Sequence, residues 1–222
     1  MFSPESYEFM SNNMKINVKS IESKLNESFF MEHSETAKDT IETFTKIIIK
    51  LEGLEAKRDL HHDDEAIKFI NSYYSGLVES IKDDKVIQVF DALRIAFIQY
   101  LSGGLYELYT YQENGEWHPE IILTEILIPN DIDSLNETLT LYRGCDISEF
   151  ESKVFRQAWT TSLTVAERFA YINYFGYDGF DVSKRVVLET TYYRKHVLFS
   201  KQSGEYEVVI NTSMLGCVRK YS

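Results

Sequence analysis

Three short segments of this 222-residue chain contain residue types that could bind and cleave a charged substrate. The first joins an arginine to a glycine, the second carries three hydroxyls, and the third holds two glutamates one residue apart. They are Tyr142, Arg143 and Gly144; Thr160, Thr161 and Ser162; and Glu205, Tyr206 and Glu207. Each segment alone has an ordinary explanation as a surface cation, an edge strand or a pair of solvated acids. Their order along the chain makes them the candidate site.

Arg143 and Gly144 end a predicted strand, where an arginine presents a rigid fork of donors to a phosphate group. A glycine in the next position lets a ligand approach the backbone without meeting a side chain. We therefore expect these two residues to hold an anionic part of the substrate.

Glu205 and Glu207 open another predicted strand, and residues two apart in an extended strand share one face at a separation of roughly 7 Å. Tyr206 is then expected on the opposite face. A carboxylate beside a carbon that develops positive charge stabilises the transition state more than the ground state, which is the condition for catalysis. With two acids on one face, one can stabilise the positive charge while the other activates the acceptor.

The elements that must position these segments are helical in the first part of the chain. Apolar residues at helical spacing predict helices over residues 36–60, from about 62 to 74, and over 85–101. The third helix has the clearest apolar stripe: Val86, Val89, Phe90, Leu93, Phe97 and Leu101. The pair Gly103 and Gly104 is expected to end it. Residues 1–35 indicate one or two short helices.

Short β-branched runs bounded by Gly, Asn, Asp and Ser follow, and they predict strands. The runs are residues 121–129, 138–144, 185–193 and 205–213, with one helix at about 164–175. The expected fold class is therefore α+β. We expect a single domain, in which a mainly helical lobe over residues 1–130 packs on a β-rich part over residues 131–222.

The chain carries 23 basic and 35 acidic residues, and its net charge of −12 argues against a protein that coats nucleic acid through its phosphates. Residues 1–140 carry −14 and residues 141–222 carry +2, which fits an acidic helical lobe beside a site for a small anionic ligand. The sequence opens without a signal-peptide pattern and contains no apolar run of about eighteen residues. We expect a cytoplasmic protein without membrane association.

The other chemistry-bearing residues have simpler interpretations. Cys145 and Cys217 are expected to be reduced thiols, although a single bridge between them stays open. The segment HHDDE at 61–65 contains metal-ligand types, but adjacent residues point in different directions and the aspartates suit a helix start, so we predict no metal site. His118 and His196 stand alone and are expected to be structural.

Taken together, the segments resemble the signature of mono-ADP-ribosyltransferases of the arginine, serine, glutamate type, a family that includes bacterial toxins and phage enzymes. LTLYRG, AWTTSLTVAERFA and SGEYEVVI occur in the family's order between residues 138 and 212. The resemblance implies a β-sandwich-like ADP-ribosyltransferase core and NAD as the donor of ADP-ribose. It assigns NAD binding to five residues: Arg143, Gly144, Thr160, Thr161 and Ser162.

By the same resemblance, Glu207 is the catalytic glutamate that stabilises the ribose oxocarbenium ion. Nicotinamide leaves as a neutral molecule, so no general acid is required, in contrast to ordinary glycoside hydrolysis. The hydroxyl segment orients this glutamate in the family. Threonine stands where the family has its first serine, so whether Thr160 or Ser162 orients Glu207 stays open.

Glu205 is the second catalytic residue that the resemblance implies. Glutamate in this position is typical of relatives that modify arginine, whose guanidinium must give a proton to a carboxylate before it attacks. The expected activity is transfer of ADP-ribose to a protein arginine. RNA, DNA or water as the acceptor stays open, as does a degenerate protein that only binds.

The family also implies a biological setting and a loop over the nicotinamide. We expect a toxin, an effector or a phage enzyme, delivered into a target cell or controlled by an antitoxin or activator on the acidic lobe. The loop would span residues 174–184. Stacking on the nicotinamide is expected from Tyr174, Phe175, Tyr177 or Phe180, and packing in the core is the alternative for each ring.

Overall fold

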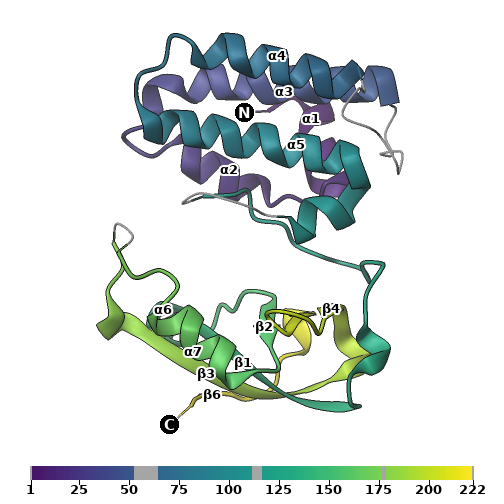
Figure 1. The fold of residues 1–222 in the computed structure, drawn as a ribbon, viewed down its shortest axis with the longest axis vertical. Helices are drawn as coiled ribbons and strands as arrows, with labels where there is room; N and C mark the ends of the chain where they lie inside the picture. The colour runs from purple at the N-terminus through teal and green to yellow at the C-terminus, as the bar shows by residue number, and fades with distance from the viewer. Residues whose placement is uncertain (1, 53–64, 112–116, 177–178, 222) are drawn as a thin grey trace. The chain divides into compact units, whose positions relative to one another are not determined.

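The computed structural model describes residues 2–52, 65–111, 117–176 and 179–221 (Figure 1). The chain divides into two compact units, Met1–Ile122 and Leu123–Ser222. The first unit is helical and the second contains the sheet, as the change of pattern along the sequence predicts. No described helix is long and apolar enough to cross a lipid bilayer.

The first unit is built on three long helices, α3 (Ser34–Glu52), α4 (Glu65–Val78) and α5 (Asp84–Thr110). Short helical segments precede them: α1 (Pro4–Glu8), the π-helix η1 (Phe9–Asn13), α2 (Val18–Leu25) and the 3₁₀ turn η2 (Met31–His33). Phe44 of α3 makes edge-to-face ring contacts with Tyr73 of α4 at 5.7 Å and with Phe97 of α5 at 5.6 Å. These contacts show that the apolar stripes of the three helices meet.

The apolar stripe predicted for residues 85–101 is buried along its whole length. Asp83 caps this helix, because its carboxylate accepts from the amides of Lys85 and Val86. The expected end at Gly103 and Gly104 is confirmed, because both glycines have non-helical backbone angles, with φ values of −154° and +65°. They divide α5 by a kink, and a second helical stretch follows as far as Thr110. The predicted end of the first helix at residue 60 and the predicted start of the second at about residue 62 lie outside the described residues.

Six antiparallel strands form one sheet in the second unit, in the order β4-β5-β2-β1-β3-β6. They are β1 (Thr138–Asp146), β2 (Ala158–Thr160), β3 (Arg185–Tyr193), β4 (Val197–Lys201), β5 (Glu207–Ile210) and β6 (Val218–Lys220). Two helices accompany the sheet, α6 (Ile147–Ser152) and α7 (Leu163–Tyr171), together with the 3₁₀ turns η3 (Ile132–Ser134), η4 (Val182–Lys184), η5 (Arg194–His196) and η6 (Thr212–Met214). A mixed α and β fold is thus confirmed. The described strands make a single sheet, where a sandwich-like core was expected.

The two faces of the sheet carry different cores. Leu141 and Cys145 of β1 point toward a cluster that includes Trp159 and Val208, and Phe150 of α6 packs against it. We call this side the α6 face. On the other side, Ala166 and Ala170 of α7 pack on Val187 of β3, with Tyr142 and Leu163 beside them. We call this side the α7 face.

The strand predicted over residues 121–129 is wrong. Ile121 makes only an isolated bridge with Ile16, and the backbone beyond it follows no strand. The amide of the Gln157 side chain takes the place of a strand partner, because it accepts from the Leu123 N–H and donates to the Leu123 carbonyl, both at 2.8 Å. A side chain distant in sequence therefore satisfies the backbone that a ladder would otherwise pair.

Candidate active site

One row of directly paired residues crosses all six strands of the sheet. Its members, from β4 to β6, are Lys201, Glu207, Thr160, Tyr142, Glu189 and Arg219. Directly opposite residues on neighbouring antiparallel strands point to the same side, so the row belongs to the α7 face, where Tyr142 packs. The row contains one residue from each of the three segments singled out in the sequence: Tyr142, Thr160 and Glu207.

Thr160 is the hydroxyl residue that the sheet pairs with Glu207. Its side chain is buried, and its Oγ1 donates to the carbonyl of Glu205 at 2.8 Å and accepts from the amide of Ser162 at 3.0 Å. The end of β2 is thereby tied to the residues that precede β5. Of the two candidates for orienting Glu207, Thr160 is the one that lies directly across from it.

The other two hydroxyls of this segment lie beyond the strand, because β2 ends at Thr160. Ser162 is the N-cap of α7, and its Oγ accepts from the amide of Val165 at 3.4 Å. Thr161 donates through Oγ1 to the side-chain oxygen of Gln202 at 2.9 Å. The three hydroxyls therefore do not share one strand, since the segment turns from strand β2 into helix α7.

Gln202 is a site residue that the sequence reasoning missed. Its amide nitrogen donates to Oγ of Ser200 at 3.1 Å and to the carbonyl of Glu207 at 3.2 Å, while its oxygen accepts from Thr161. The backbone N–H of Gln202 donates to the Asp131 carboxylate at 2.6 Å. A polar residue five positions before the glutamate is the only signal in the sequence, and it does not reveal these bonds.

Glu205 and Glu207 do not lie on the same extended strand. β5 begins at Glu207, and Tyr206 has a φ of +53°, in the left-handed region. Since the alternation of faces requires an extended backbone, the predicted shared face does not follow from the strand. Glu205 is exposed, and Tyr206 is also exposed, to 45%. The first glutamate and the tyrosine thus belong to a turn at the edge of the candidate site.

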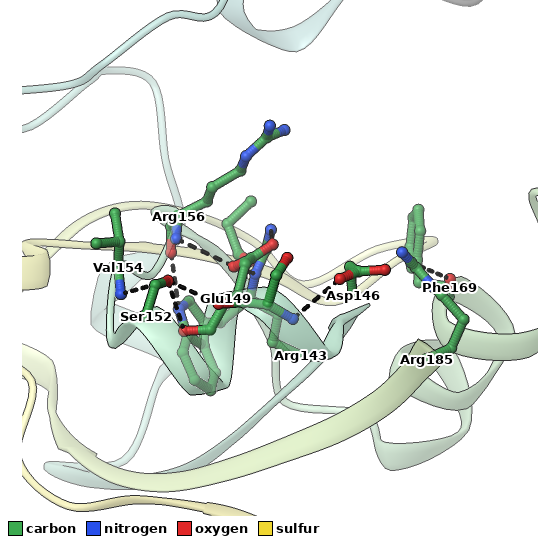
Figure 2. A network of polar contacts seen from close by, with 11 residues as sticks. Arg143, Asp146, Glu149, Ser152, Val154, Arg156, Phe169 and Arg185 are labelled. Carbon is green, nitrogen blue, oxygen red and sulfur yellow. Dashed lines mark hydrogen bonds and ion pairs between the residues drawn. The ribbon is translucent and has the colours of Figure 1, made fainter. Parts of the chain in front are cut away.

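Arg143 makes a two-point ion pair with Glu149 of α6, through Nε and Nη2 at 2.9 Å each (Figure 2). Its Nη1 also donates to the carbonyl of Ala158 in β2 at 2.6 Å. Burial opposes the charge of Arg143, but the bonds to Glu149 outweigh burial and raise the pKa of the guanidinium. Burial likewise acts to raise the pKa of Glu149, and the bonds from Arg143 hold that pKa below its usual value. A phosphate would have to compete with Glu149 for these donors.

Position 144 requires a glycine because helix α7 packs against it. The sequence had predicted the close approach of a ligand as the reason. A methyl group at this position would overlap the carbonyl oxygen of Ala166 and would lie 2.5 Å from the amide nitrogen of Ala170. Both atoms belong to the backbone of α7. The absence of a side chain at Gly144 therefore lets α7 pack directly on β1.

The strand register places Arg143 and Glu207 on opposite faces of the sheet. Arg143 is paired with Leu188, which lies in the cluster on the α6 face, whereas Tyr142 next to it packs on the α7 face. Glu207 shares the α7 face through its pairing with Thr160. The structure thus brings Thr160 and Glu207 together, and Arg143 reaches the backbone of β2 from the other face through its bond to the carbonyl of Ala158.

Aromatic residues of the predicted nicotinamide loop gather around Arg185. The guanidinium of Arg185 lies 5.9 Å from the ring centre of Tyr174 and 5.8 Å from that of Phe180, and it donates to the last carbonyls of α7. Phe175 is 79% exposed. Core packing does not account for Phe175, while Tyr177 lies outside the described residues.

Among the residues that the structure describes, no three histidine, cysteine, aspartate or glutamate side chains gather as a metal site, and positions 61–64 lie outside them. His118 donates through its Nδ1–H to the carbonyl of Pro119 at 2.9 Å, and burial lowers the pKa of the imidazole. His196 lies in η5, next to Tyr192. Cys145 is buried, Cys217 is exposed, and both are free thiols.

Comparisons with models of protein families, with curated proteins and with solved structures find no match to this chain.

Proposed function

We propose that residues 123–222 form an NAD-dependent mono-ADP-ribosyltransferase, which cleaves the bond between nicotinamide and ribose and transfers ADP-ribose to a macromolecule. The observation that carries this proposal is the pairing of Tyr142 with Thr160 and of Thr160 with Glu207. Segments 65 residues apart in sequence (142 to 207) thereby come to lie on three adjacent strands, and this supports one common site for the hydroxyl and the glutamate of the sequence signature.

In the proposed reaction, the bond between the ribose carbon and the nicotinamide nitrogen breaks, and its electron pair leaves with the neutral nicotinamide. Glu207 stabilises the cationic ribose that remains, because a fixed carboxylate interacts more strongly with the charge as it develops. The acceptor nitrogen then bonds to the ribose carbon and loses a proton, which Glu205 takes up. Thr160 and Gln202 hold the backbone on either side of Glu207.

Arg143 acts in this proposal as a positioning residue. It holds the carbonyl of Ala158, two residues before Thr160, and so fixes the strand that faces Glu207. The pyrophosphate then needs a cation on the α7 face. Lys201 is exposed and lies directly across from Glu207 in the register, so we assign this role to Lys201.

The test compares two carboxylates of the same row. The full chain is incubated with NAD, and free nicotinamide and label from adenine-labelled NAD on lysate proteins are both measured. Glu207→Gln is expected to lower nicotinamide release by at least about a hundredfold, the order of effect seen when one transition-state contact is removed. Glu189→Gln alters a carboxylate three strands away in the row, paired with Arg219, and is expected to leave release within about threefold.

Equal activity of the Glu207→Gln protein and the unchanged chain would contradict the proposal. Circular dichroism and the urea midpoint show whether both variants fold, so that a loss of activity is attributed to chemistry. A chain that neither releases nicotinamide nor is stabilised against heat by NAD would also contradict it.

A further inference from the structure

Two lysines from distant parts of the chain meet over one aromatic ring on the α6 face. The ring belongs to Phe150 of α6, which packs against the core of this face. The Nζ atom of Lys153, the C-cap of α6, lies 3.6 Å from the centre of the ring. The Nζ atom of Lys220 in β6 lies 5.2 Å from the same centre. One ring therefore has two ammonium groups over it.

The fold delivers each lysine to this ring separately. Lys220 pairs with Leu188 of β3, which belongs to the core of the α6 face, so the strand register directs Lys220 to that side. Lys153 stands three positions after Phe150, and residues at this spacing on a helix are neighbours. Its φ of +58° ends α6 at this residue. A helix end and an edge strand thus supply the two cations.

Neither ammonium group has an anionic partner. Among the residues that the structure describes, no carboxylate forms an ion pair with Lys153 or Lys220, although the chain holds 35 acidic and 23 basic residues. Of the two carboxylates of α6, Glu149 is held by Arg143 (Figure 2). The other, Glu151, follows Phe150 by one position and so points about 100° away from it around the helix. Both lysines are exposed and accessible to a ligand.

The arrangement leaves an excess of positive charge at this place. The separation of the two Nζ atoms cannot exceed the sum of their distances to the ring centre, which is comparable with the screening length of about 8 Å at physiological ionic strength. The two ammonium groups therefore repel each other. The ring attracts each of them, but it carries no net charge and leaves this repulsion in place. A bound anion would offset it.

A phosphoryl dianion has the charge that matches two ammonium groups. Lysine binds phosphate as a point charge, whereas a planar carboxylate with a single charge is better suited to the fork of an arginine. RNA and DNA are disfavoured as ligands, because the net charge of −12 repels a long chain of phosphates far more than one small anion.

We propose that Lys153 and Lys220, over the ring of Phe150, form a binding site for a phosphoryl dianion on the α6 face. This site lies on the opposite side of the sheet from Glu207 and is independent of the proposed transferase function. A free phosphate ion and a phosphorylated side chain of another protein share the same chemistry, and the experiment has an arm for each.

The experiment measures binding and needs no enzymatic activity. The full chain, labelled with ¹⁵N, is titrated with inorganic phosphate and, separately, with sodium chloride at equal ionic strength, and amide shifts are followed by NMR. The variants are Lys153→Gln, Lys220→Gln and the two together. Lys195→Gln is the matched control, because Lys195 is also an exposed lysine over one ring, that of Tyr193, with no second ammonium group over that ring.

Phosphate is expected to shift the amides of Phe150, Lys153 and Lys220 with a Kd in the millimolar range, and chloride is expected not to. Each single variant should raise the Kd about threefold and the double variant about tenfold, since each exposed charge contributes modestly. Lys195→Gln should keep the Kd within about 1.5-fold. The urea midpoint of every variant should stay unchanged, because the replaced groups lie at the surface.

The second arm compares a phosphoserine peptide with the same peptide carrying serine. A phosphopeptide that binds at least about tenfold more tightly than free phosphate, and loses this advantage in the double variant, assigns the site to a phosphorylated protein. Equal affinity for the two probes assigns it to free phosphate.

Three results would overturn the proposal. The first is equal shifts with phosphate and with chloride, and the second is an unchanged Kd for phosphate in the folded double variant. The third is a single-stranded oligonucleotide that displaces phosphate and binds more tightly than either phosphate probe, because the site would then serve a nucleic-acid backbone.

Discussion

The guanidinium of Arg143 and the carboxylate of Glu149 meet through two hydrogen bonds of 2.9 Å, and their side chains are only 14% and 17% exposed. The pair joins β1 to α6, and the third bond, to the carbonyl of Ala158, adds β2 to the same contact. Two charges in this setting are stable only as partners, because either one alone would be buried without compensation. This relationship makes Arg143 a structural centre of the second unit.

Removal of one partner is expected to destabilise the protein strongly. Arg143→Ala and Glu149→Ala should each lower the free energy of unfolding by about 3 kcal/mol, because each leaves an uncompensated charge behind. The double variant Arg143→Ala with Glu149→Ala should cost clearly less than the sum of the two. Urea unfolding of the four proteins gives the coupling energy. Additive single effects would show that the two side chains do not act as a pair.

The pair also predicts how stability depends on pH. Its bonds hold the pKa of Glu149 below the ordinary value of 4.5 although burial acts to raise it, and the folded state therefore favours the charged form. A lowered folded pKa contributes stability fully above the unfolded value, and the contribution is lost as the pH falls through the folded pKa. The advantage of the unchanged chain over Glu149→Gln in urea should be constant near neutral pH and shrink below about pH 4.5. A difference that stays the same at all pH values would exclude this linkage.

Gly144→Ala is expected to lower stability by about 3 kcal/mol or more, because the new methyl meets backbone atoms of Ala166 and Ala170 and α7 has to move off β1. Gly216→Ala is the matched control in the same unit, since a methyl there meets nothing within 4 Å. Thermal and urea unfolding of both variants measure the difference. Equal stability of the two variants would mean that α7 does not pack against Gly144.

The two cysteines are expected to react differently with thiol reagents. Burial, followed by the charge of Glu149, raises the pKa of Cys145 to about 12, whereas Cys217 is exposed. Alkylation of the native protein near neutral pH should therefore label Cys217 alone, and in urea the reagent should also label Cys145. Mass spectrometry of peptides identifies the labelled residue, with Cys217→Ser as the control. Native labelling of Cys145 would show that the cluster on the α6 face opens readily.

Much of the fold follows from patterns in the sequence. The stripe from Val86 to Leu101 predicts the buried face of α5, and the β-branched runs predict β1, β3 and β5. These elements were predictable because local periodicity records which side of an element is buried. Strand β4 and helix α6 lack such a clear pattern, and the run at 121–129 has a strand-like composition, although at Leu123 the side chain of Gln157 satisfies the backbone. Composition cannot show which partner satisfies a backbone.

The sequence by itself determined which residue types are present and in what order: the arginine, the hydroxyls and the glutamates on short β-rich runs. Only the tertiary structure decided that Thr160 lies across from Glu207, that Arg143 pairs with Glu149 on the other face, and that α7 packs against Gly144. The physical reason is that face and partner depend on strand register and on a single left-handed residue, Tyr206. Both are settled by contacts between residues far apart in the chain.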